Sequence, residues 1–516
     1  MSDARSAEWF AEKISDRTIR GIALETSALI RAGVLPVGTK LPAVRDLAFR
    51  LQVSPATISE AWSELRLNIY SGDKMSDARS AEWFAEKISD RTIRGIALET
   101  SALIRAGVLP VGTKLPAVRD LAFRLQVSPA TISEAWSELR RQKIITGRGR
   151  NGTWVSGDRF VARPERLASS GNYGENVLDL TRAGPDVRLL PPLAEAMAYG
   201  ASAHELNSYE RSRILPELEV AARATWPYDP EAFLATNGGY NAIYTLFHAL
   251  VTSGNTVAIE NPTAMRLLDI LEDRGVRIIP VECDNDGPIV SSLQQAMLQK
   301  PSAFLFQPRL HSVTGQTVSK ERIEALGDVL EGTDTLIIED DGVADVSDAP
   351  RQSLGARFPD RVIHILSYSK TLGPDLRLAV LSSSKAIVEE IQSYRSFSAG
   401  WTSRVLQSAG AWLLRDPSTQ ETVARAGEIY AQRRDTLSNA LRERGLTVEN
   451  GKGLCNWIPV TSAQFAMVTL AARGIAVHPG TKFSITPSNY IRVATGALTD
   501  RCEEVADGIA LASGPP

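Results

Sequence analysis

The sequence predicts a multidomain chain: a winged helix-turn-helix head, then a large α/β domain with a smaller C-terminal α+β subdomain. Three observations carry this prediction. The 516 residues are enough for two to four domains. Residues 75–155 show helical periodicity that ends in a glycine-rich turn, and apolar runs beyond residue 177 alternate with amphipathic segments. A hydrophobic content of 43% with 23% charged residues is typical of globular proteins.

Composition argues against several classes of protein. The net charge of −3 gives no overall basicity, so any signal for nucleic acid has to be local. Cys283, Cys455 and Cys502 are widely spaced, which fits neither a disulfide framework nor a metal site and is typical of a reduced compartment. The N-terminus resembles no secretion signal, and no apolar run approaches the ~20 residues that span a bilayer. We therefore expect a cytoplasmic protein without a metal.

The chain begins with a repeat. Residues 1–66 recur letter for letter as residues 75–140, after a junction at 67–74. Structural repeats keep their pattern while their letters drift, so identity indicates either a very recent duplication or an artefact of gene assembly, and both remain open. The first copy lacks the continuation after Arg140, so we interpret 1–66 as a partial duplicate.

The second copy, with that continuation, predicts the head domain at 75–155. Residues 91–107 and 117–126 have helical spacing, separated by a Pro- and Gly-containing break. A third helix follows Ser128, a suitable N-cap, with Pro129 at its first position. The run "KIITGRGRNGTWV" then predicts two short strands around a glycine-rich turn, a wing. The predicted inward-facing residues of the three helices are Ile93, Ile96, Ala97, Leu103, Ile104, Val118, Leu121, Ala122, Leu125, Ile132, Ala135, Trp136 and Leu139.

The third helix and the wing predict DNA binding. The outer face of the helix starts with the small residues Ala130 and Thr131, which allow close approach to base edges. Between Arg140 and Arg150 there are five basic residues and no acidic one, a cluster suited to phosphates. Glycine in the wing, Gly152 included, lets the backbone approach DNA. The alternative is a small helical bundle with a solvated basic hairpin.

A polar linker at 156–176 leads to the large domain at 177–516. The runs "TVAIE", "RIIPVE", "AFLFQP", "TLIIED", "RVIHILS" and "LAVLSS" predict strands. Their alternation with amphipathic segments predicts a mostly parallel sheet covered by helices on both faces. In such sheets ligands bind beyond the carboxyl ends of the strands.

Polar residues follow several of these strands. Lys370 comes after "VIHIL", where partial desolvation favours the neutral amine that forms a Schiff base. Asp340 and Asp341 end another strand, where a carboxylate can pair with a protonated pyridine nitrogen. The turn at Gly238–Gly239, together with Ser367, Ser369 and Arg377, suits a phosphate. Each feature alone has a plain structural explanation, but together they predict a site for pyridoxal 5′-phosphate (PLP).

Two resemblances sharpen these expectations. "GVLPVGTKLPAVRDLAFRLQVSPATISEAW" and "GRGRNGTWV" resemble the GntR family of bacterial regulators, whereas "LTRAGPDVRLLPPL", "PRLHSVTG", "SYSKTLGPDLRLA" and "YIRVATGAL" resemble fold-type I PLP-dependent aminotransferases. That fusion is the MocR subfamily of transcriptional regulators, and "SKTLGPDLRLA" is most similar to its PtsJ-type members, which are linked to vitamin B6 metabolism.

The resemblance implies roles for individual residues. Lys370 would form the internal aldimine, Asp340 would face the pyridine nitrogen and Arg492 would bind an effector carboxylate. The implied phosphate-holding residues are Gly239, Tyr240, Ser367, Ser369 and Arg377. The DNA-contacting candidates are Lys114, Arg119, Ser128, Ala130, Thr131, Arg148, Arg150 and Gly152.

The sequence also departs from the aminotransferase pattern. Ser312 replaces the asparagine that binds the cofactor's phenolic oxygen, Gly342 and Val343 stand where a tyrosine is usual, and Ala264 replaces the stacking aromatic. Losing stacking and two hydrogen bonds costs roughly 1–3 kcal/mol. Cofactor binding survives such a loss more readily than catalysis does.

The sequence therefore predicts a homodimeric, PLP-responsive, DNA-binding transcriptional regulator, which senses PLP or an amino compound and is not an enzyme. Two alternatives remain: an active aminotransferase with an accessory DNA-binding domain, and an aminotransferase fold kept only for dimerisation.

Overall fold

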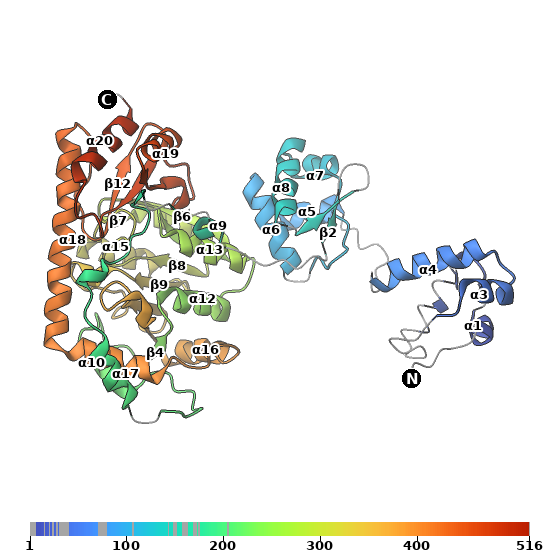
Figure 1. Ribbon diagram of the computed structural model, residues 1–516, viewed down its shortest axis with the longest axis horizontal. Coiled ribbons are helices and arrows are strands. Elements are labelled where there is room, and N and C mark those ends of the chain that lie inside the picture. The colour runs from blue at the N-terminus through green and yellow to red at the C-terminus, as the bar shows by residue number, and fades with distance from the viewer. Residues whose placement is uncertain are drawn as a thin grey trace. The chain divides into compact units, whose positions relative to one another are not determined.

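The chain folds as two compact units, residues 1–160 and 161–516, which are described separately (Figure 1). The computed structural model describes residues 7–14, 16–19, 21–22, 25–26, 29, 41–70, 80–105, 108–142, 144–147, 152–156, 164–168, 173, 176–203 and 206–514. Arg148 and Arg150 of the predicted wing lie outside the described residues, as does much of the predicted linker.

In the first unit, residues 80–156 form the predicted winged helix. Its helices are α5 (Ala81–Lys87), α6 (Ile93–Arg105), α7 (Val118–Leu125) and α8 (Pro129–Arg141), and its strands β1 (Ile145–Thr146) and β2 (Trp154–Val155) pair antiparallel. Helix α5 was not predicted, although Ser80 caps it by accepting a hydrogen bond from the Trp83 amide.

The predicted core of this domain is largely confirmed. Ser128 caps α8 through a hydrogen bond from the Thr131 amide at 3.1 Å, and Trp136 is fully buried. The exception is Ile93, which is 36% exposed because it opens the first turn of α6, at the end of the helix.

The described residues of the first copy form α1 (Ala7–Lys13), α3 (Val44–Leu51) and α4 (Pro55–Tyr70). They pack as the second copy does, with Phe10 edge-on to Trp62 at 6.3 Å where Phe84 meets Trp136 at 6.5 Å. Trp62 is 7% exposed and Trp136 is not exposed. The core of the second copy also contains wing residues that have no counterpart in the first.

In the second unit, the described strands form an eight-stranded sheet in the order β4-β11-β10-β9-β8-β5-β6-β7. Strands β10, β9, β8, β5 and β6 run parallel, as predicted. All six predicted strands are present, whereas β4 had not been predicted as a separate strand. The strands are β4 (Ala232–Thr236), β5 (Thr256–Asn261), β6 (Arg277–Asp284), β7 (Gly287–Pro288), β8 (Ala303–Phe306), β9 (Leu336–Asp341), β10 (Val362–Ser367) and β11 (Ala379–Ser383).

Strand β11 is antiparallel to both of its neighbours, β10 and β4. The reason lies in its connection. Residues 368–378 link β10 to β11 through a short turn and the 3-10 helix η4 (Pro374–Leu376), whereas a parallel pair needs a longer crossover. The reversal places Lys370 in the turn at the carboxyl end of β10.

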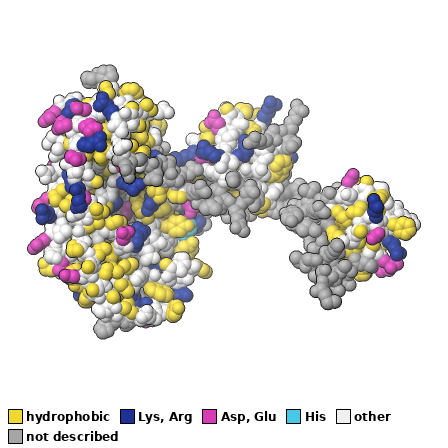
Figure 2. Space-filling model, viewed as in Figure 1, with side chains coloured by type: hydrophobic (Ala, Val, Ile, Leu, Met, Phe, Trp, Pro, Cys, Tyr) yellow, Lys and Arg dark blue, Asp and Glu magenta, His cyan; other side chains and the backbone are white. Residues whose placement is uncertain are grey.

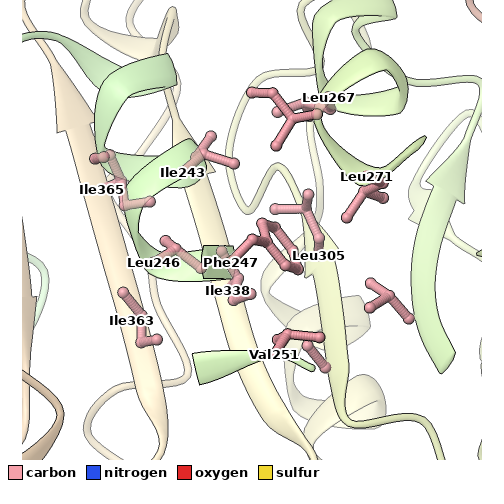
Figure 3. Close-up of a cluster of buried hydrophobic side chains, with 14 of the residues drawn as sticks. Ile243, Leu246, Phe247, Val251, Leu267, Leu271, Leu305, Ile338, Ile363 and Ile365 are labelled. Atoms are coloured by element: carbon pink, nitrogen blue, oxygen red, sulfur yellow. The ribbon is translucent and has the colours of Figure 1, made fainter. Parts of the chain in front are cut away.

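Helices cover both faces of the sheet. On one face, Ile243, Leu246 and Phe247 of α12 (Gly239–Leu250) project onto Ile338, Ile363 and other sheet residues (Figure 3). The other helices of this unit are α9 (Glu165–Ala168), α10 (Ala194–Ala201), α11 (Pro216–Arg223), α13 (Met265–Arg274), α14 (Val290–Met297), α15 (Lys320–Leu330), α16 (Lys385–Arg395), α17 (Arg404–Arg415), α18 (Pro417–Glu443), α19 (Ala463–Ala472) and α20 (Cys502–Ser513).

The long helix α18 leads into the predicted C-terminal α+β subdomain. There β12 (Cys455–Pro459), β15 (Tyr490–Ala494) and β14 (His478–Pro479) form an antiparallel sheet, and β13 (Ile475–Ala476) pairs with β3 (Leu178–Asp179). This pairing joins the start of the domain to its end. Among the described residues, no helix is long and apolar enough to cross a membrane.

Candidate functional site

Lys370 lies in the turn that follows β10, and its amine is largely buried. Its Nζ donates a hydrogen bond to the carbonyl oxygen of Ala183 at 2.7 Å. Burial lowers the pKa of Lys370 from its ordinary value of 10.5 to about 8, and the positive charges of Arg492 and Arg266 act in the same direction. A neutral amine is therefore accessible near neutral pH, as a lysine that reacts with an aldehyde requires.

The adjacent carboxylates of β9 point to opposite faces of the sheet, because successive strand residues alternate. Asp340 is on the same face as Ile338, which packs against α12. Among the described residues, no hydrogen bond or ion pair engages the Asp340 carboxylate. Burial raises the pKa of Asp340 to about 7, with the charges of Glu260 and Asp341 adding to the effect. A buried carboxylate without a partner suits a ligand that presents a positively charged N–H.

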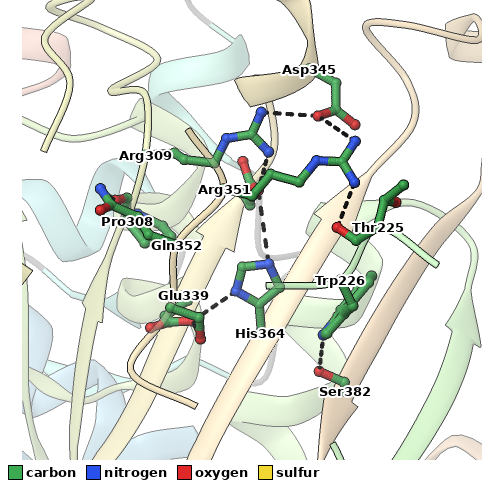
Figure 4. A network of polar contacts seen from close by, with 12 residues as sticks. Thr225, Trp226, Pro308, Arg309, Glu339, Asp345, Arg351, Gln352, His364 and Ser382 are labelled. Atoms are coloured by element: carbon green, nitrogen blue, oxygen red, sulfur yellow. Dashed lines mark hydrogen bonds and ion pairs between the residues drawn. The ribbon is translucent and has the colours of Figure 1, made fainter. Parts of the chain in front are cut away.

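Asp341 is committed to a buried polar network on the other face. Figure 4 labels its partners Arg309 and His364. Its carboxylate forms an ion pair with Arg309 at 3.0 Å, and Arg309 also pairs with Asp345 at 2.9 Å. His364 lies between Glu339, at 2.7 Å, and Asp341, at 3.8 Å. Buried charges need such partners. Of the two predicted carboxylates, Asp340 is thus the one available to a ligand.

A second polar cluster lies at the carboxyl ends of β5 and β8. Glu260 accepts hydrogen bonds from the Gln307 amide at 3.0 Å and from its side chain at 2.6 Å. The backbone N–H of Ser312 donates to Gln307 Oε1 at 2.8 Å. Burial raises the pKa of Glu260 to about 7 and lowers the pKa of His311 to about 4. This cluster fixes the position of Ser312.

The predicted phosphate residues come together at the start of α12. Gly238 has a φ of +97°, a conformation that favours glycine. A Cβ atom there would lie 3.0 Å from Arg377 Nη2, and one at Gly239 would lie 3.1 Å from Cβ of Ser367. Ser367 donates to the hydroxyl of Ser369 at 3.2 Å. Backbone N–H groups, two hydroxyls and a guanidinium thus form a cradle for an anion.

Tyr240 follows this turn, and its ring packs against a positively charged side chain. The guanidinium of Arg266 lies over the Tyr240 ring at 4.6 Å from the centroid, a favourable cation–π geometry. Burial raises the pKa of Tyr240 to about 12, with Asp340 as the next cause, so the phenol and this carboxylate are near neighbours. Arg266 was not predicted as a site residue. No sequence signal identified Arg266, because the family pattern places its ring-contacting residue, an aromatic one, at position 264.

Arg492 projects from β15 toward the segment that contains Ala183. One Nη donates to the carbonyl of Thr181, and the guanidinium stacks on Phe483 at 4.5 Å. The Nε atom is buried and has no hydrogen-bond partner in the described structure. Arg492 is 7% exposed and has no carboxylate partner among the described residues, so it is suited to receive one from a ligand.

The positions that depart from the aminotransferase pattern have small or apolar side chains. Ala264 is 7% exposed and belongs to the core cluster beneath α13. Val343 is partly buried against the hydrophobic cluster that contains Leu310 and Cys455. A Cβ atom at Gly342 would lie 3.1 Å from Asp340 Oδ1, so a larger residue there would press on that carboxylate.

Together these groups fit PLP. A buried amine of lowered pKa, an unpartnered carboxylate and an anion cradle lie at the ends of neighbouring strands. They match the aldehyde, the pyridine nitrogen and the phosphate of that cofactor.

The predicted DNA-contact residues that the structure describes lie at the starts of α7 and α8 and at the base of the wing in the second copy of the head. Arg119 and Ala130 are exposed, and the Thr131 hydroxyl lies 2.9 Å from that of Ser128. Gly152 has a φ of +94°, and Lys114 packs beside it with its ammonium 6.0 Å from the Trp154 ring. The start of α8 and the base of the wing therefore carry the candidate contacts.

Two family models match the chain. The model of aminotransferase class I and II covers residues 175–509. The model of bacterial regulatory proteins of the gntR family matches residues 18–67 and 92–155, one match in each copy of the head. The predicted combination of domains and the predicted fold class are confirmed.

The chain is similar to named transcriptional regulators and, in the fold of its large domain, to aminotransferases. The vitamin B6 salvage pathway transcriptional repressor PtsJ of Salmonella typhimurium is 32% identical over 77% of this chain and 92% of its own. The HTH-type transcriptional regulator TauR of Rhodobacter capsulatus is 25% identical over 77% of this chain and 90% of its own. Kynurenine aminotransferase of Pyrococcus horikoshii shares the fold, with a TM-score of 0.61 at 17% identity over 67% of this chain and 92% of that one.

Proposed function

Because the chain belongs to the GntR-type transcriptional regulators that carry an aminotransferase class I and II domain, the MocR subfamily, we propose that it couples PLP binding at Lys370 to DNA binding. The observation that carries this proposal is the convergence of three unlike groups at one sheet edge: the Lys370 amine, the Asp340 carboxylate and the Gly238–Gly239 cradle.

PLP supplies an aldehyde that reacts reversibly with amines and a ring that withdraws electrons when its nitrogen is protonated. Lys370 supplies the neutral amine, and Ala183 orients it through its carbonyl oxygen. Asp340 holds a proton on the ring nitrogen, because a buried carboxylate gains most from a charged partner. Gly239, Ser367 and Arg377 bind the phosphate.

Ser369 and Tyr240 would complete the phosphate site, and Ser312, which replaces the family's asparagine, would face the phenolic oxygen. Arg492 binds the carboxylate of an amino effector. Its unpartnered Nε is the group that such an effector would satisfy.

DNA binding is assigned to the second copy of the head. Thr131 and Ala130 at the start of α8 approach the base edges, and Ser128 holds that turn in place. Lys114, Arg119 and the wing residues Arg148 and Arg150 contact phosphates, and Gly152 allows the wing to approach closely.

We further propose that the large domain forms a homodimer. Tyr209 and Phe397 are each 89% exposed, and Val187 is 77% exposed. Hydrophobic side chains also gather on the lower part of the large domain, near the ends of α10 and α17 (Figure 2). Large exposed apolar side chains suit a protein interface, and a second copy of the chain is the partner that also pairs two DNA-binding heads.

The site serves binding rather than turnover. Ala264 leaves one ring face without an aromatic partner, and Gly342 and Val343 provide no hydroxyl for the phenolic oxygen. Aminotransferase chemistry needs the ring held in a fixed geometry, whereas a covalent bond to Lys370 would retain the cofactor without it. A sensor of PLP, or of an amino compound that reacts with it, fits these residues.

Two measurements on the full-length chain test the proposal. PLP is added to the purified protein, the complex is reduced with borohydride, and the modified peptide is identified by mass spectrometry. We expect a single adduct at Lys370 that Lys370→Ala abolishes. PLP should also change the affinity for a DNA duplex selected from a random pool by the protein. An adduct at another residue, or a DNA affinity that is the same with and without bound PLP, would contradict the proposal.

A further inference from the structure

The linker ahead of the large domain is anchored on one helix of that domain. Arg166 of α9 forms ion pairs with Asp269 at 3.1 Å and with Glu272 at 2.7 Å, both on α13. The side chains of Arg166 and Asp269 are 10% and 3% exposed, so this is no loose surface contact. Glu272 accepts from both terminal nitrogens of the guanidinium, at 2.8 and 2.7 Å, a bidentate geometry of high specificity.

Asp269 also binds the linker backbone. The N–H groups of Arg166 and Leu167 donate to its two carboxylate oxygens, each at 3.3 Å. The carboxylate therefore caps the start of the short helix α9 while it pairs with the arginine. A segment of four helical residues is too short to be stable alone, so the acidic face of α13 is what holds it in place.

The other end of α13 belongs to the ligand site. The helix starts at Met265, directly after Ala264, and its second residue is Arg266, which lies over Tyr240. Arg266 precedes Asp269 by one helical turn. Leu267 and Leu271 seat the helix in the core beside α12, so one packed helix connects the ligand site to the linker anchor.

The start of α13 is also tied to the effector residue. The N–H of Thr263 donates a hydrogen bond to the carbonyl of Phe483 at 2.8 Å, and the guanidinium of Arg492 stacks on the ring of Phe483. Lys482 lies near enough for Asp269 to raise its pKa against the opposing effects of burial and Arg492. Groups that line the ligand site thus reach the linker anchor through a single helix.

We propose that the acidic face of α13, formed by Asp269 and Glu272, is a docking surface for the linker segment around Arg166, and that ligand occupancy sets how firmly the linker is held. The second half of this statement rests on the function proposed above. The linker precedes the sensor domain and follows the DNA-binding head, so its release changes the freedom of that head. A ligand acts by shifting the balance between a docked and an undocked linker.

Limited proteolysis with chymotrypsin tests the docking. The linker offers Phe160, Leu167 and Tyr173 as cleavage points, and mass spectrometry identifies cuts between residues 157 and 176. Proteolysis reports the population of the open segment. We expect Arg166→Ala to be cut about tenfold faster than the wild type. The matched control is Arg501→Ala, which removes an exposed arginine–glutamate pair with Glu504 and should leave the rate unchanged.

A second variant guards against local misfolding. Asp269→Asn with Glu272→Gln keeps the arginine and the shape of the surface but removes the charge, and it should open the linker to a similar extent. The thermal melt of both variants should match that of the wild type. Equal cleavage rates for wild type and both variants would overturn the docking.

The coupling is tested by repeating the digestion with PLP. In the wild type, PLP should change the linker cleavage rate at least about threefold, and in Arg166→Ala the effect should vanish while the visible band of bound PLP persists. A wild-type rate that stays constant with PLP bound would overturn the coupling but leave the docking. If the wild type binds no PLP, the proposed function and the coupling both fall, and the digestion without PLP still decides the docking.

Discussion

The lowered pKa of Lys370 makes uptake of PLP depend on pH in a defined window. The pKa falls from 10.5 to about 8, mainly through burial. At pH 7 a lysine of pKa 8 is neutral in ~9% of molecules, against ~0.03% for an unperturbed lysine. The buried lysine therefore has about 300-fold more reactive amine at this pH.

The lowered pKa of Lys370 determines how the rate of PLP uptake changes with pH. Only the neutral amine attacks the aldehyde, so the rate of uptake should fall about tenfold per pH unit below pH 8 and level off above it. The assay is stopped-flow absorbance of full-length protein mixed with excess PLP between pH 6 and 10. Lys370→Ala should show no visible band and an unchanged fold, since a turn lysine contributes little to the core.

Removing a neighbouring cation tests the contribution of nearby positive charge to the lowered pKa of Lys370. In Arg266→Gln the loss of positive charge favours protonated Lys370, so the curve should move up by about half a pH unit. Lys320→Gln removes an exposed lysine at the start of α15 and should leave the curve in place. A rate that still rises tenfold per unit through pH 9.5 would show that Lys370 is not buried as described, and the reasoning would fail.

Further predictions concern turnover, the wing and the repeat. Because Ala264 and Ser312 replace the usual ring contacts, steady transamination of amino donors should stay far below ~1 per second, and a faster rate in a coupled assay would restore the enzyme reading. Replacing Arg148 and Arg150 with glutamine should weaken binding to all DNA and reduce the salt slope by about two, whereas an unchanged slope would place the DNA surface elsewhere. Deleting residues 1–74 should leave DNA affinity within a few-fold; a loss beyond tenfold, ~1.4 kcal/mol, would make the first copy a functional head.

Local chemistry explains what the sequence could predict. The cap at Ser128 and the inward stripe around Trp136 follow from rules that act within one helix. The six apolar strands were readable because buried parallel strands are continuously hydrophobic. Strand β4 was not predicted, because its run "AFLAT" is only five residues long and its last two residues also begin the predicted glycine-rich turn.

The rest depends on contacts between distant segments. The strand pattern alone left Asp340 and Asp341 equivalent, and only the family resemblance singled out Asp340. The physical difference between them is the ion pair of Asp341 with Arg309, in the loop that follows the neighbouring strand β8. Arg266 becomes a site residue because Tyr240, 26 positions earlier, presents its ring. Arg166 finds Asp269 across more than 100 residues of sequence, a pairing that neither periodicity nor composition encodes.

The partial cover of Trp62 has a consequence for folding. The helices of the two copies share one sequence. The wing that covers the core of the second copy would therefore fit the core of the first copy equally well, and the two copies compete for the wing. Ile145 follows Arg140 by 5 residues and Arg66 by 79. Closing the longer loop costs about 2 kcal/mol more, which gives the adjacent core an advantage in effective concentration of tens-fold. Tether length alone, with no difference in affinity, therefore assigns the wing to the copy that carries Trp136.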